Sequence, residues 1–411
     1  MKYILIIGDG MADNALDALG GMTPLQKAKI PVMDALAERG TLGSVKNCPD
    51  GQPPGSDTAI LSIFGCDPKR YYFGRAPLEA AAQGIMLKDG DLAFRCNMAS
   101  VENADLPFGE KKIISHSSGS IDGAQSRELV LELFSDPEFK AAAEKAGVKI
   151  YPTYSYRHIA VQTGGDGENL EMSPPHDHLG EKVSKHLPRG NKNAEVLASL
   201  MALSNKILSR NPINEMRRKA GKLPCNCCWF WAQGTAASLP SFEGRYGKKG
   251  AVISAVPLCH GIGALMGLQK INVEGATGEL DTNYEGKAEA AVKALRDGFD
   301  FVAVHVEAPD ECTHNLDVEG KIKAIENIDS RVILPMVKAQ NDSGEDFRML
   351  ILSDHKTLST TGAHDGAPVP FILYDSRLQK GSGMGYSEES GLLGQYLPNG
   401  VALMDMLFQK D

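Results

Sequence analysis

The sequence has few cysteines, few aromatic residues and no long hydrophobic run. Only 8 of its 411 residues are cysteine, and Cys225, Cys227 and Cys228 have no second cysteine pair at zinc-finger spacing. This scarcity excludes a disulfide scaffold and favours buried thiols in a reducing cytoplasm. Aromatic residues make up 6% of the chain, hydrophobic residues 42% and charged residues 23%. This composition is typical of a globular protein and excludes intrinsic disorder.

The chain also lacks a candidate membrane span. Its longest apolar runs, such as 4–7 and 251–258, are far shorter than the ~20 residues that a transmembrane helix needs. Gly8, Asp9 and Gly10 interrupt the first apolar run, so we expect no signal peptide. The formal net charge of −9 argues against nucleic acid or an anionic membrane as the main partner. It permits a small anionic substrate that is bound by a local basic cluster or a metal.

Short apolar runs alternate with helical patterns along most of the chain. The first run, Tyr3 to Ile7, is almost entirely apolar, which is typical of a strand buried on both faces of a parallel sheet. We expect further strands at 41–45, 229–232, 251–256, 301–306, 349–352 and 369–373, and helices at 31–39, 288–297 and 322–337. The alternation predicts an α/β protein with a doubly wound core sheet.

The middle of the chain has a different pattern, with more charge and a short meander. Strands expected at 149–151 and 156–162 precede a polar, glycine-rich turn at 164–167. Because α/β alternation resumes afterwards, we expect an inserted domain and not a third domain in series. The sequence therefore predicts a core formed by 1–111 and 188–411, and a smaller inserted α+β domain at 112–187.

Aspartate and histidine residues follow several of the expected strands. These residues are Asp9, Asp310, His314, Asp354, His355 and His364. Ligands bind at the carboxyl ends of strands in open α/β sheets, so we expect these side chains at one edge of one sheet. A single aspartate there is more often a cap or turn residue, but the repetition favours a shared site. Mixed carboxylate and imidazole ligands suit zinc or manganese, and a pair of ions suits phosphoryl transfer.

The segment 53–59, Pro-Pro-Gly-Ser-Asp-Thr-Ala, predicts a tight turn before an apolar helix. Ser56 then lies at or near the helix N-terminus, where free backbone N–H groups and the helix dipole stabilise an anion. By itself, such a serine is usually a helix cap. Beside a pair of metal ions, its hydroxyl is better explained as a nucleophile that metal coordination deprotonates.

The order of these motifs resembles the alkaline phosphatase superfamily. The motifs are Gly-Asp-Gly at 8–10, Gly-Ser-Asp-Thr-Ala at 55–59, Glu-Ala-Pro-Asp-Glu-x-x-His at 307–314 and Asp-His-x-Thr at 354–357. Within this superfamily, the whole chain resembles the cofactor-independent phosphoglycerate mutases of the archaeal type. The resemblance implies an alkaline-phosphatase-like core. It also implies a cytoplasmic, glycolytic isomerase that converts 3-phosphoglycerate to 2-phosphoglycerate through a phosphoserine.

The resemblance also assigns roles to individual residues. It implies that Ser56 accepts the phosphoryl group and returns it to the substrate. Two ion sites are implied, one formed by Asp9, Ser56, Asp354 and His355, and the other by Asp310, His314 and His364. Manganese is the family's usual ion, with zinc, cobalt or magnesium as substitutes.

A mutase must hold the dephosphorylated glycerate while it reorients, because water would otherwise discharge the phosphoserine. We expect the inserted domain to act as a lid whose basic side chains bind the carboxylate and phosphate groups. The candidates are Arg75, Arg95, His116, Arg157 and His158. For each of the arginines, the alternative is a solvated surface charge.

One segment departs from the archaeal pattern. Archaeal mutases have an arginine-rich segment of the Asp-Arg-Arg-Ala-Gly-Arg kind, whereas this chain has Ser-His-Ser-Ser-Gly-Ser at 115–120. A bacterial branch that is similar here has been proposed to act as a homoserine kinase. The alternatives are therefore phosphotransfer to homoserine and, if the lid seals badly, metal-dependent phosphomonoester hydrolysis. A non-catalytic metal-binding protein is a further alternative, which the intact nucleophile and ligands disfavour.

Overall fold

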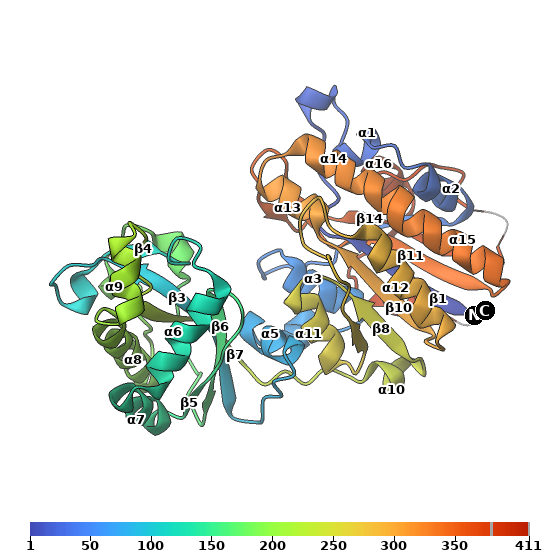
Figure 1. Cartoon of the computed structure of the whole chain (residues 1–411). Helices are drawn as coiled ribbons and strands as arrows, with labels where there is room; N and C mark the ends of the chain where they lie inside the picture. Colours follow the sequence, from blue (N-terminus) through green and yellow to red (C-terminus); the bar gives the residue numbers. More distant parts are fainter. Residues whose placement is uncertain (379–380, 410–411) are drawn as a thin grey trace. The chain divides into compact units, whose positions relative to one another are not determined.

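The computed structural model describes residues 1–378 and 381–409, and the chain divides into two compact units (Figure 1). The core unit consists of Met1–Tyr72 and Ser238–Asp411, and the inserted unit of Phe73–Ala237. Among the described residues, no helix combines the length and apolar character that crossing a membrane requires.

The core unit contains an eight-stranded sheet with the strand order β15-β2-β14-β11-β1-β10-β8-β9. The strands are β1 (Lys2–Gly8), β2 (Thr41–Val45), β8 (Gly250–Ile253), β9 (Gln269–Ile271), β10 (Phe301–Val306), β11 (Phe347–Ser353), β14 (Val369–Asp375) and β15 (Gln395–Leu397). The central strands β11, β1, β10 and β8 are parallel, whereas β14 is antiparallel to both of its neighbours. The predicted α/β class is confirmed, with one strand reversed.

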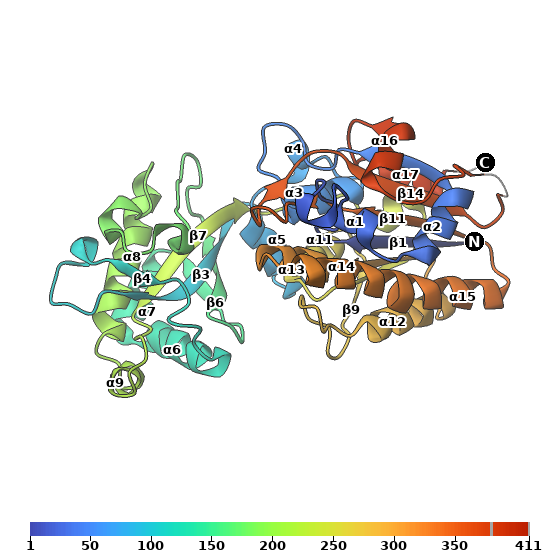
Figure 2. The same ribbon diagram turned by 90° about the horizontal axis from the view of Figure 1, so that it is seen from above.

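Helices cover both faces of the core sheet (Figure 2). One face carries α1 (Pro24–Lys27), α2 (Pro31–Arg39), α12 (Tyr284–Arg296), α14 (Val318–Asn327) and α15 (Leu334–Ser343). The other face carries α3 (Ser56–Ile63), α10 (Phe242–Tyr246), α11 (Pro257–Leu265) and α17 (Ala402–Phe408). The shorter elements of this unit are η1 (Asp17–Leu19), α4 (Pro68–Tyr71), α13 (Ala308–His314), α16 (Glu388–Leu393), β12 (Lys356–Thr357) and β13 (His364–Asp365).

This double coverage explains why the central strands are almost entirely apolar. In β10, Val302 and Val304 pack into the core beneath α12 and α14, whereas Phe301 contacts the rings of Phe64 and Phe242 on the opposite face. Fully burying such a side chain contributes about 1.5–3 kcal/mol. Side chains on both faces of β10 are therefore apolar. The alternation of apolar and polar residues that is expected of a sheet with one exposed face is absent from this strand.

The helix expected at 322–337 is present but is interrupted. A π-helical turn, η5 (Ile328–Ile333), separates α14 from α15. Pro335 lies in the first turn of α15, and proline has no N–H to donate to a preceding carbonyl. A single wider turn is a common way for a long helix to accommodate such a residue.

The inserted unit is an α+β unit whose sheet has the order β4-β3-β6-β5, with β7 also paired to β3. Its strands are β3 (Asp91–Val101), β4 (Ile113–Ser115), β5 (Val148–Tyr151), β6 (Arg157–Thr163) and β7 (Cys227–Thr235). Its helices are α5 (Arg75–Ala82), α6 (Gly123–Ser135), α7 (Pro137–Lys145), α8 (Lys192–Leu208) and α9 (Pro212–Lys219). The short helices η2 (Phe108–Glu110), η3 (Pro175–His178) and η4 (Val183–Lys185) lie in its connections.

The boundaries expected at 112 and 187 are too narrow. Strands β3 and β7 lie outside that range, yet they pair antiparallel with each other inside the inserted unit. Helices α8 and α9 also belong to this unit, and α8 packs on β7. An apolar strand such as 229–232 has the same sequence pattern in either sheet, so its partner could not be assigned from the pattern.

Candidate functional site

The carboxyl ends of three adjacent core strands carry three buried aspartates. Asp9 follows β1, Asp310 lies in the first turn of α13 just after β10, and Asp354 follows β11. Because β1 pairs in parallel with β10 and β11, all three connections leave the sheet at the same edge. The aspartates are 5%, 7% and 1% exposed, respectively. The structure thus brings Asp9 together with two residues that lie about 300 or more positions later in the sequence.

Asp9, Asp354 and His355 form a first group of possible metal ligands, with one ligand atom from each within 4.8 Å of the others. Asp354 Oδ1 accepts hydrogen bonds from the backbone N–H groups of Gly10 (3.0 Å) and His355 (2.9 Å). Its Oδ2 is buried and accepts no hydrogen bond from any described residue. A buried carboxylate oxygen in that position is costly unless a cation faces it. This group therefore fits a metal ion.

Asp310, His314 and His364 form a second group of the same kind. His314 Nδ1 lies 2.7 Å from the carbonyl oxygen of Gly362, which can only accept, so this nitrogen carries a proton. His314 Nε2 then points at Asp310 Oδ2 (3.0 Å) and at His364 Nε2 (3.1 Å). Two imidazole nitrogens and a carboxylate oxygen that converge in this way suit a divalent transition metal.

The electrostatics of the two groups also favour cations. Burial, together with the charges of Asp354 and Asp310, raises the pKa of Asp9 well above its ordinary value. The hydrogen bond to Asp310 raises the pKa of His314 to about 9. Neighbouring carboxylates contribute to both shifts, after burial in the case of Asp9, so the cluster favours positive charge in the form of a proton or a metal. The donor sets and their charge thus support the binding of divalent metals.

Ser56 is the first residue of α3 and faces the first ligand group. Its Oγ lies 3.1 Å from His355 Nε2, and 3.5 and 3.4 Å from the two carboxylate oxygens of Asp9. The neighbouring Asp57 is held by the Tyr72 hydroxyl, which donates to Asp57 Oδ2 at 2.6 Å. The serine hydroxyl is therefore placed among ligands at a helix N-terminus, where an anion is stabilised.

Gly10 allows the loop after β1 to approach the second ligand group closely. Its φ is +59°, in the left-handed region that favours glycine. An added Cβ would lie 2.4 Å from Thr357 Oγ1 and 2.6 Å from Asp310 Oδ1. Any larger residue would therefore displace side chains of the site.

A buried ion pair joins the loops that carry the ligands. Lys321 of α14 lies with its Nζ 2.8 Å from Asp13 Oδ2, and it donates to the Thr357 carbonyl oxygen at 2.7 Å. The Thr357 hydroxyl in turn donates to Asp310 Oδ1 at 2.5 Å. This chain of contacts ties the loop after β1 to the loop after β11.

We expect Lys321→Met to lower the free energy of unfolding by about 3–5 kcal/mol, because it leaves the Asp13 carboxylate buried without its partner. The double variant with Asp13→Leu should recover part of this loss, which a double-mutant cycle in urea would measure. Lys323→Met, on the exposed side of the same helix, is the control and should change stability by less than about 0.5 kcal/mol. A loss in Lys321→Met no larger than in the control would contradict the prediction.

In the inserted unit, Arg75, Arg95 and Arg157 gather around Glu79, and we call these four residues the arginine cluster. Arg95 Nε donates to Glu79 Oε2 at 3.0 Å, and its Nη2 pairs with Oε1. Arg75 Nε and Arg157 Nη1 lie 3.6 and 4.0 Å from the same Oε1. Three guanidinium groups share one carboxylate, so the cluster keeps an excess of positive charge that suits an anion.

Aromatic and imidazole rings surround the arginine cluster. Arg95 stacks over the ring of Trp231 at 4.7 Å, and the His176 ring contacts Trp231 at 5.0 Å. His116 packs against His176, and its Nδ1 is buried without a hydrogen bond to any described residue. Burial, and then the charge of Arg157, lower the pKa of His116, so its ring is neutral at pH 7.

His158 does not join the arginine cluster, contrary to the sequence-based expectation. Successive residues of a strand point to opposite faces, so His158 and Arg157 of β6 diverge. The His158 side chain is fully buried, with Nε2 3.1 Å from Ser126 Oγ of α6 and Nδ1 accepting from the Thr153 N–H at 3.0 Å. Its partners and burial assign it a structural role in the inserted unit.

Lowering the pH should destabilise the inserted unit through His158. Burial lowers the pKa of His158 from 6.5 to about 4, so between these values only the unfolded chain takes up the proton. Stability is therefore full above about pH 6.5 and falls by up to roughly 3 kcal/mol as the pH drops to 4. Both tryptophans lie in β7, so tryptophan fluorescence during urea unfolding reports on this unit. An unchanged pH slope in His158→Gln would contradict this assignment.

Several residues of the site were not identified from the sequence. Glu79 anchors the arginine cluster, and the signal for it was a single acidic residue within an otherwise small and apolar helix. His305, with Glu307 two residues after it, contacts Asp9. The sequence signal for this contact was a histidine inside a fully buried strand. Buried polar residues need hydrogen-bond or ion-pair partners, so each of these two patterns predicts that a partner exists. Neither pattern identifies which residue the partner is.

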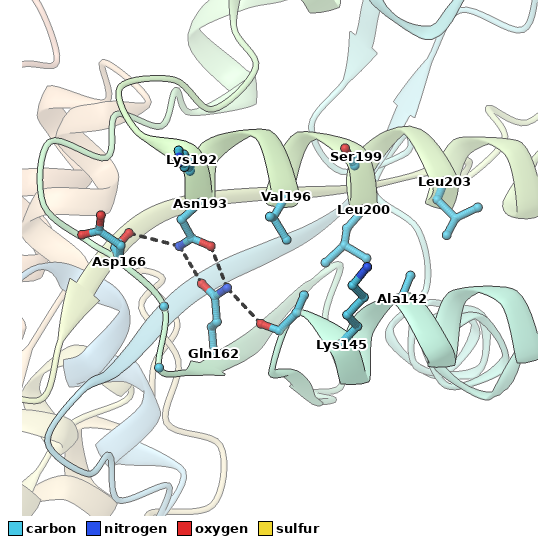
Figure 3. Close-up of a pocket in the computed structure, with 13 residues that line it drawn as sticks. Ala142, Lys145, Gln162, Asp166, Lys192, Asn193, Val196, Ser199, Leu200 and Leu203 are labelled. Carbon is cyan, nitrogen blue, oxygen red and sulfur yellow. Dashed lines mark hydrogen bonds between the residues drawn. The ribbon is translucent and has the colours of Figure 1, made fainter.

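A cavity of about 530 Å³ opens on the inserted unit, away from the arginine cluster (Figure 3). It lies between the C-terminal turn of α7, the end of β6 and the first turns of α8. The Gln162 and Asn193 amides at its floor hydrogen-bond each other at 2.8 Å in both directions. None of the residues that line it is a predicted site residue.

A model of the 2,3-bisphosphoglycerate-independent phosphoglycerate mutase family matches residues 37–214. A protein of that name from Methanosarcina acetivorans is 46% identical over 392 residues, covering 95% of this chain and 95% of the relative. A probable enzyme of that name from Geobacter sulfurreducens is 42% identical over 412 residues, covering 100% of both chains.

Solved structures agree with these sequence matches. A protein from Pyrococcus horikoshii is 30% identical, has a TM-score of 0.81, and is matched over 100% of this chain and 98% of its own. The cofactor-independent phosphoglycerate mutase from Thermoplasma acidophilum is 28% identical, with a TM-score of 0.65 and coverage of 100% of this chain and 99% of its own. The similarity therefore extends over both the core unit and the inserted unit.

Proposed function

The chain belongs to the 2,3-bisphosphoglycerate-independent phosphoglycerate mutase family, and from this premise we propose that it interconverts 3-phosphoglycerate and 2-phosphoglycerate. The observation that carries the proposal is the position of Ser56. Its hydroxyl lies at the start of α3, within 3.5 Å of Asp9 and His355. We propose the core unit as the catalytic unit and the inserted unit as the unit that binds the substrate.

Two divalent ions, most suitably Mn²⁺, are part of the proposal. Asp9, Ser56, Asp354 and His355 would hold one ion, and Asp310, His314 and His364 would hold the other. When bound, such ions lower the pKa of a hydroxyl and neutralise charge on a phosphoryl group. Mixed oxygen and nitrogen donors also accept zinc or cobalt.

Ser56 is the proposed nucleophile. Its Oγ forms a bond to phosphorus while the bond between phosphorus and the substrate oxygen breaks, and the hydroxyl proton ends on that departing oxygen, so that glycerate is released with both hydroxyls. In the second half of the reaction, the other hydroxyl of the glycerate takes the phosphoryl group, and the proton that it loses returns to Ser56. Because Ser56 is the first residue of α3, the dipole of this helix would stabilise the negative charge of the phosphoserine.

The arginine cluster is the proposed binding site for the anionic groups of the substrate. Arg75 and Arg157 are the better candidates for direct contact, since their side chains are 42% and 31% exposed. Arg95 is 3% exposed and is occupied by Glu79, so we propose that it orients the carboxylate that the other two arginines share. The neutral ring of His116 would add a hydrogen bond to the substrate.

We also propose a cytoplasmic location and a small phosphorylated acid as the substrate. All eight cysteine thiols are free and buried. Burial raises the pKa of Cys66 and Cys259 to about 11, so these thiols are neither paired nor reactive. A reducing compartment suits such a protein.

An assay of the purified, manganese-loaded chain tests the proposal. Incubation with 3-phosphoglycerate should yield 2-phosphoglycerate at equilibrium, without a requirement for 2,3-bisphosphoglycerate and with little free phosphate. Homoserine with ATP is the comparison reaction, since residues 115–120 lack arginine. Formation of phosphohomoserine without 2-phosphoglycerate, or release of phosphate alone, would overturn the proposal.

A further inference from the structure

His305 lies inside the apolar strand β10 and is 1% exposed. Its Nδ1 lies 3.1 Å from Glu307 Oε1. Its Nε2 is buried, and no contact that it makes with the described residues has the geometry of a hydrogen bond. The same nitrogen lies at ion-pair distance, 3.1 Å, from Asp9 Oδ2. The imidazole ring is therefore placed between two carboxylates, one of which belongs to the first ligand group.

Glu307 is held rigidly on its other sides. Its Oε1 accepts from the Ser254 hydroxyl and the Ala255 N–H, each at 2.7 Å. Its Oε2 is paired with Lys287 Nζ at 2.5 Å, and Lys287 of α12 also donates to the His305 carbonyl oxygen at 2.9 Å. With every donor supplied by the protein, the Glu307 carboxylate serves as a fixed support for the ring.

Glu307 also begins the helix that carries the second ligand group. It is the N-cap residue of α13, and its carbonyl oxygen accepts from the Asp310 N–H at 3.1 Å. The same residue thus positions Asp310 and His314 through its backbone and contacts Asp9 through His305. We call His305, Glu307 and Lys287 the brace. The brace connects Asp9 of the first ligand group with the start of α13, which carries Asp310 and His314 of the second.

We propose that His305 is a positioning residue that orients the Asp9 carboxylate for metal binding, with Glu307 and Lys287 as its support. Contact of His305 with Oδ2 fixes the plane of the Asp9 carboxylate. Its Oδ1 then lies 3.5 Å from His355 Nε2, and Ser56 Oγ lies 3.5 and 3.4 Å from Oδ1 and Oδ2. Residues that hold a metal ligand from behind typically contribute a factor of 10–100 to metal affinity. This inference rests on the proposed metal site.

Loss of the brace should lower metal affinity, whereas loss of an ordinary buried hydrogen-bond network should lower only the stability of the fold. A histidine needed only for stability lowers the free energy of unfolding when it is replaced, but leaves metal affinity unchanged in the folded protein. A histidine that orients Asp9 lowers the affinity for metal, even where the fold is retained. Metal binding therefore separates the two roles.

The test compares Mn²⁺ binding to the metal-free full chain and to three variants, by electron paramagnetic resonance of free Mn²⁺ and by calorimetry. In His305→Leu, we expect one of the two ions to bind 10–100-fold more weakly. His305→Gln keeps a donor and should recover part of this loss. His158→Gln, at a buried histidine of β6 that belongs to neither the brace nor the ligand groups, is the control and should bind like the unchanged chain.

Activity supplies a second readout. At saturating Mn²⁺, His305→Leu should lower kcat with little change in KM for phosphoglycerate, because none of the brace residues belongs to the arginine cluster proposed to bind the substrate. Unchanged Mn²⁺ affinity in folded His305→Leu overturns the inference, as does an equal loss in His158→Gln. If His305→Leu does not fold, His305→Gln decides, since affinity equal to that of the unchanged chain would also overturn it. Absence of Mn²⁺ binding by the unchanged chain would overturn both this inference and the proposed metal site.

Discussion

Replacing Ser56 by alanine should lower kcat for phosphoglycerate interconversion by about 10⁴-fold or more while leaving the fold intact. The expected size follows from the covalent route, because removing a nucleophile leaves only binding and charge stabilisation. The hydroxyl is partly exposed at the start of α3, so its loss creates no buried cavity. The measurement is steady-state turnover of 3-phosphoglycerate with manganese present.

Ser62→Ala is the matched control for this experiment, since Ser62 lies on the same helix and is not among the site residues. It should retain turnover within a few-fold. Mass spectrometry of acid-quenched protein should find the phosphoryl group on Ser56 in the unchanged chain and on no residue of Ser56→Ala. Near-normal turnover by Ser56→Ala, or a phosphoryl group on another residue, would contradict the covalent route.

Removing the metal ions should abolish activity and lower thermal stability. Three buried carboxylates then face one another without a cation, and burial with the neighbouring charges already raises the pKa of Asp9. An ion present at 1,000 times its Kd stabilises the folded state by about 4 kcal/mol, which corresponds to a fall in Tm of several degrees or more on removal. The measurement is a thermal unfolding scan with chelator and then with added Mn²⁺.

A variant of the first ligand group and a control variant should separate this effect from nonspecific actions of the chelator. Asp354→Asn should remove most of the manganese-dependent rise in Tm, because it discharges the carboxylate whose Oδ2 makes no hydrogen bond to the described residues. Asp177→Asn, on the inserted unit, should behave like the unchanged chain. An equal manganese-dependent rise in all three proteins would contradict the proposed ligands.

Much of the core and the position of its candidate metal ligands could be predicted because the signals are local. Each central strand is a short apolar run, and the next polar residue after it, such as Asp9 or Asp354, lies at the carboxyl end of that strand. Parallel strands bring their carboxyl ends to one edge of the sheet, so the fold class alone predicts that these polar residues lie close together. Ser56 was likewise marked by the Pro-Pro-Gly turn before its helix.

The inserted unit was harder to predict because its signals are not local. Strand β3 pairs with β7 across more than a hundred residues, and no sequence period shows which sheet an apolar strand joins. His158 was expected beside Arg157 because the two are adjacent in sequence. The strand alternation that separates them could be used only once β6 had been placed between α5 and α6.

The amino-acid sequence by itself determined the α/β class, the strand-end aspartates and the serine at the helix start, because these depend on the order of polar and apolar residues along short segments. Only the tertiary structure decided which side chains support them. The pairing of His305 with Asp9, of Lys321 with Asp13 and of Glu79 with three arginines joins residues from separate elements. A buried charge must find a partner, but the partner is chosen by packing and not by proximity in the chain.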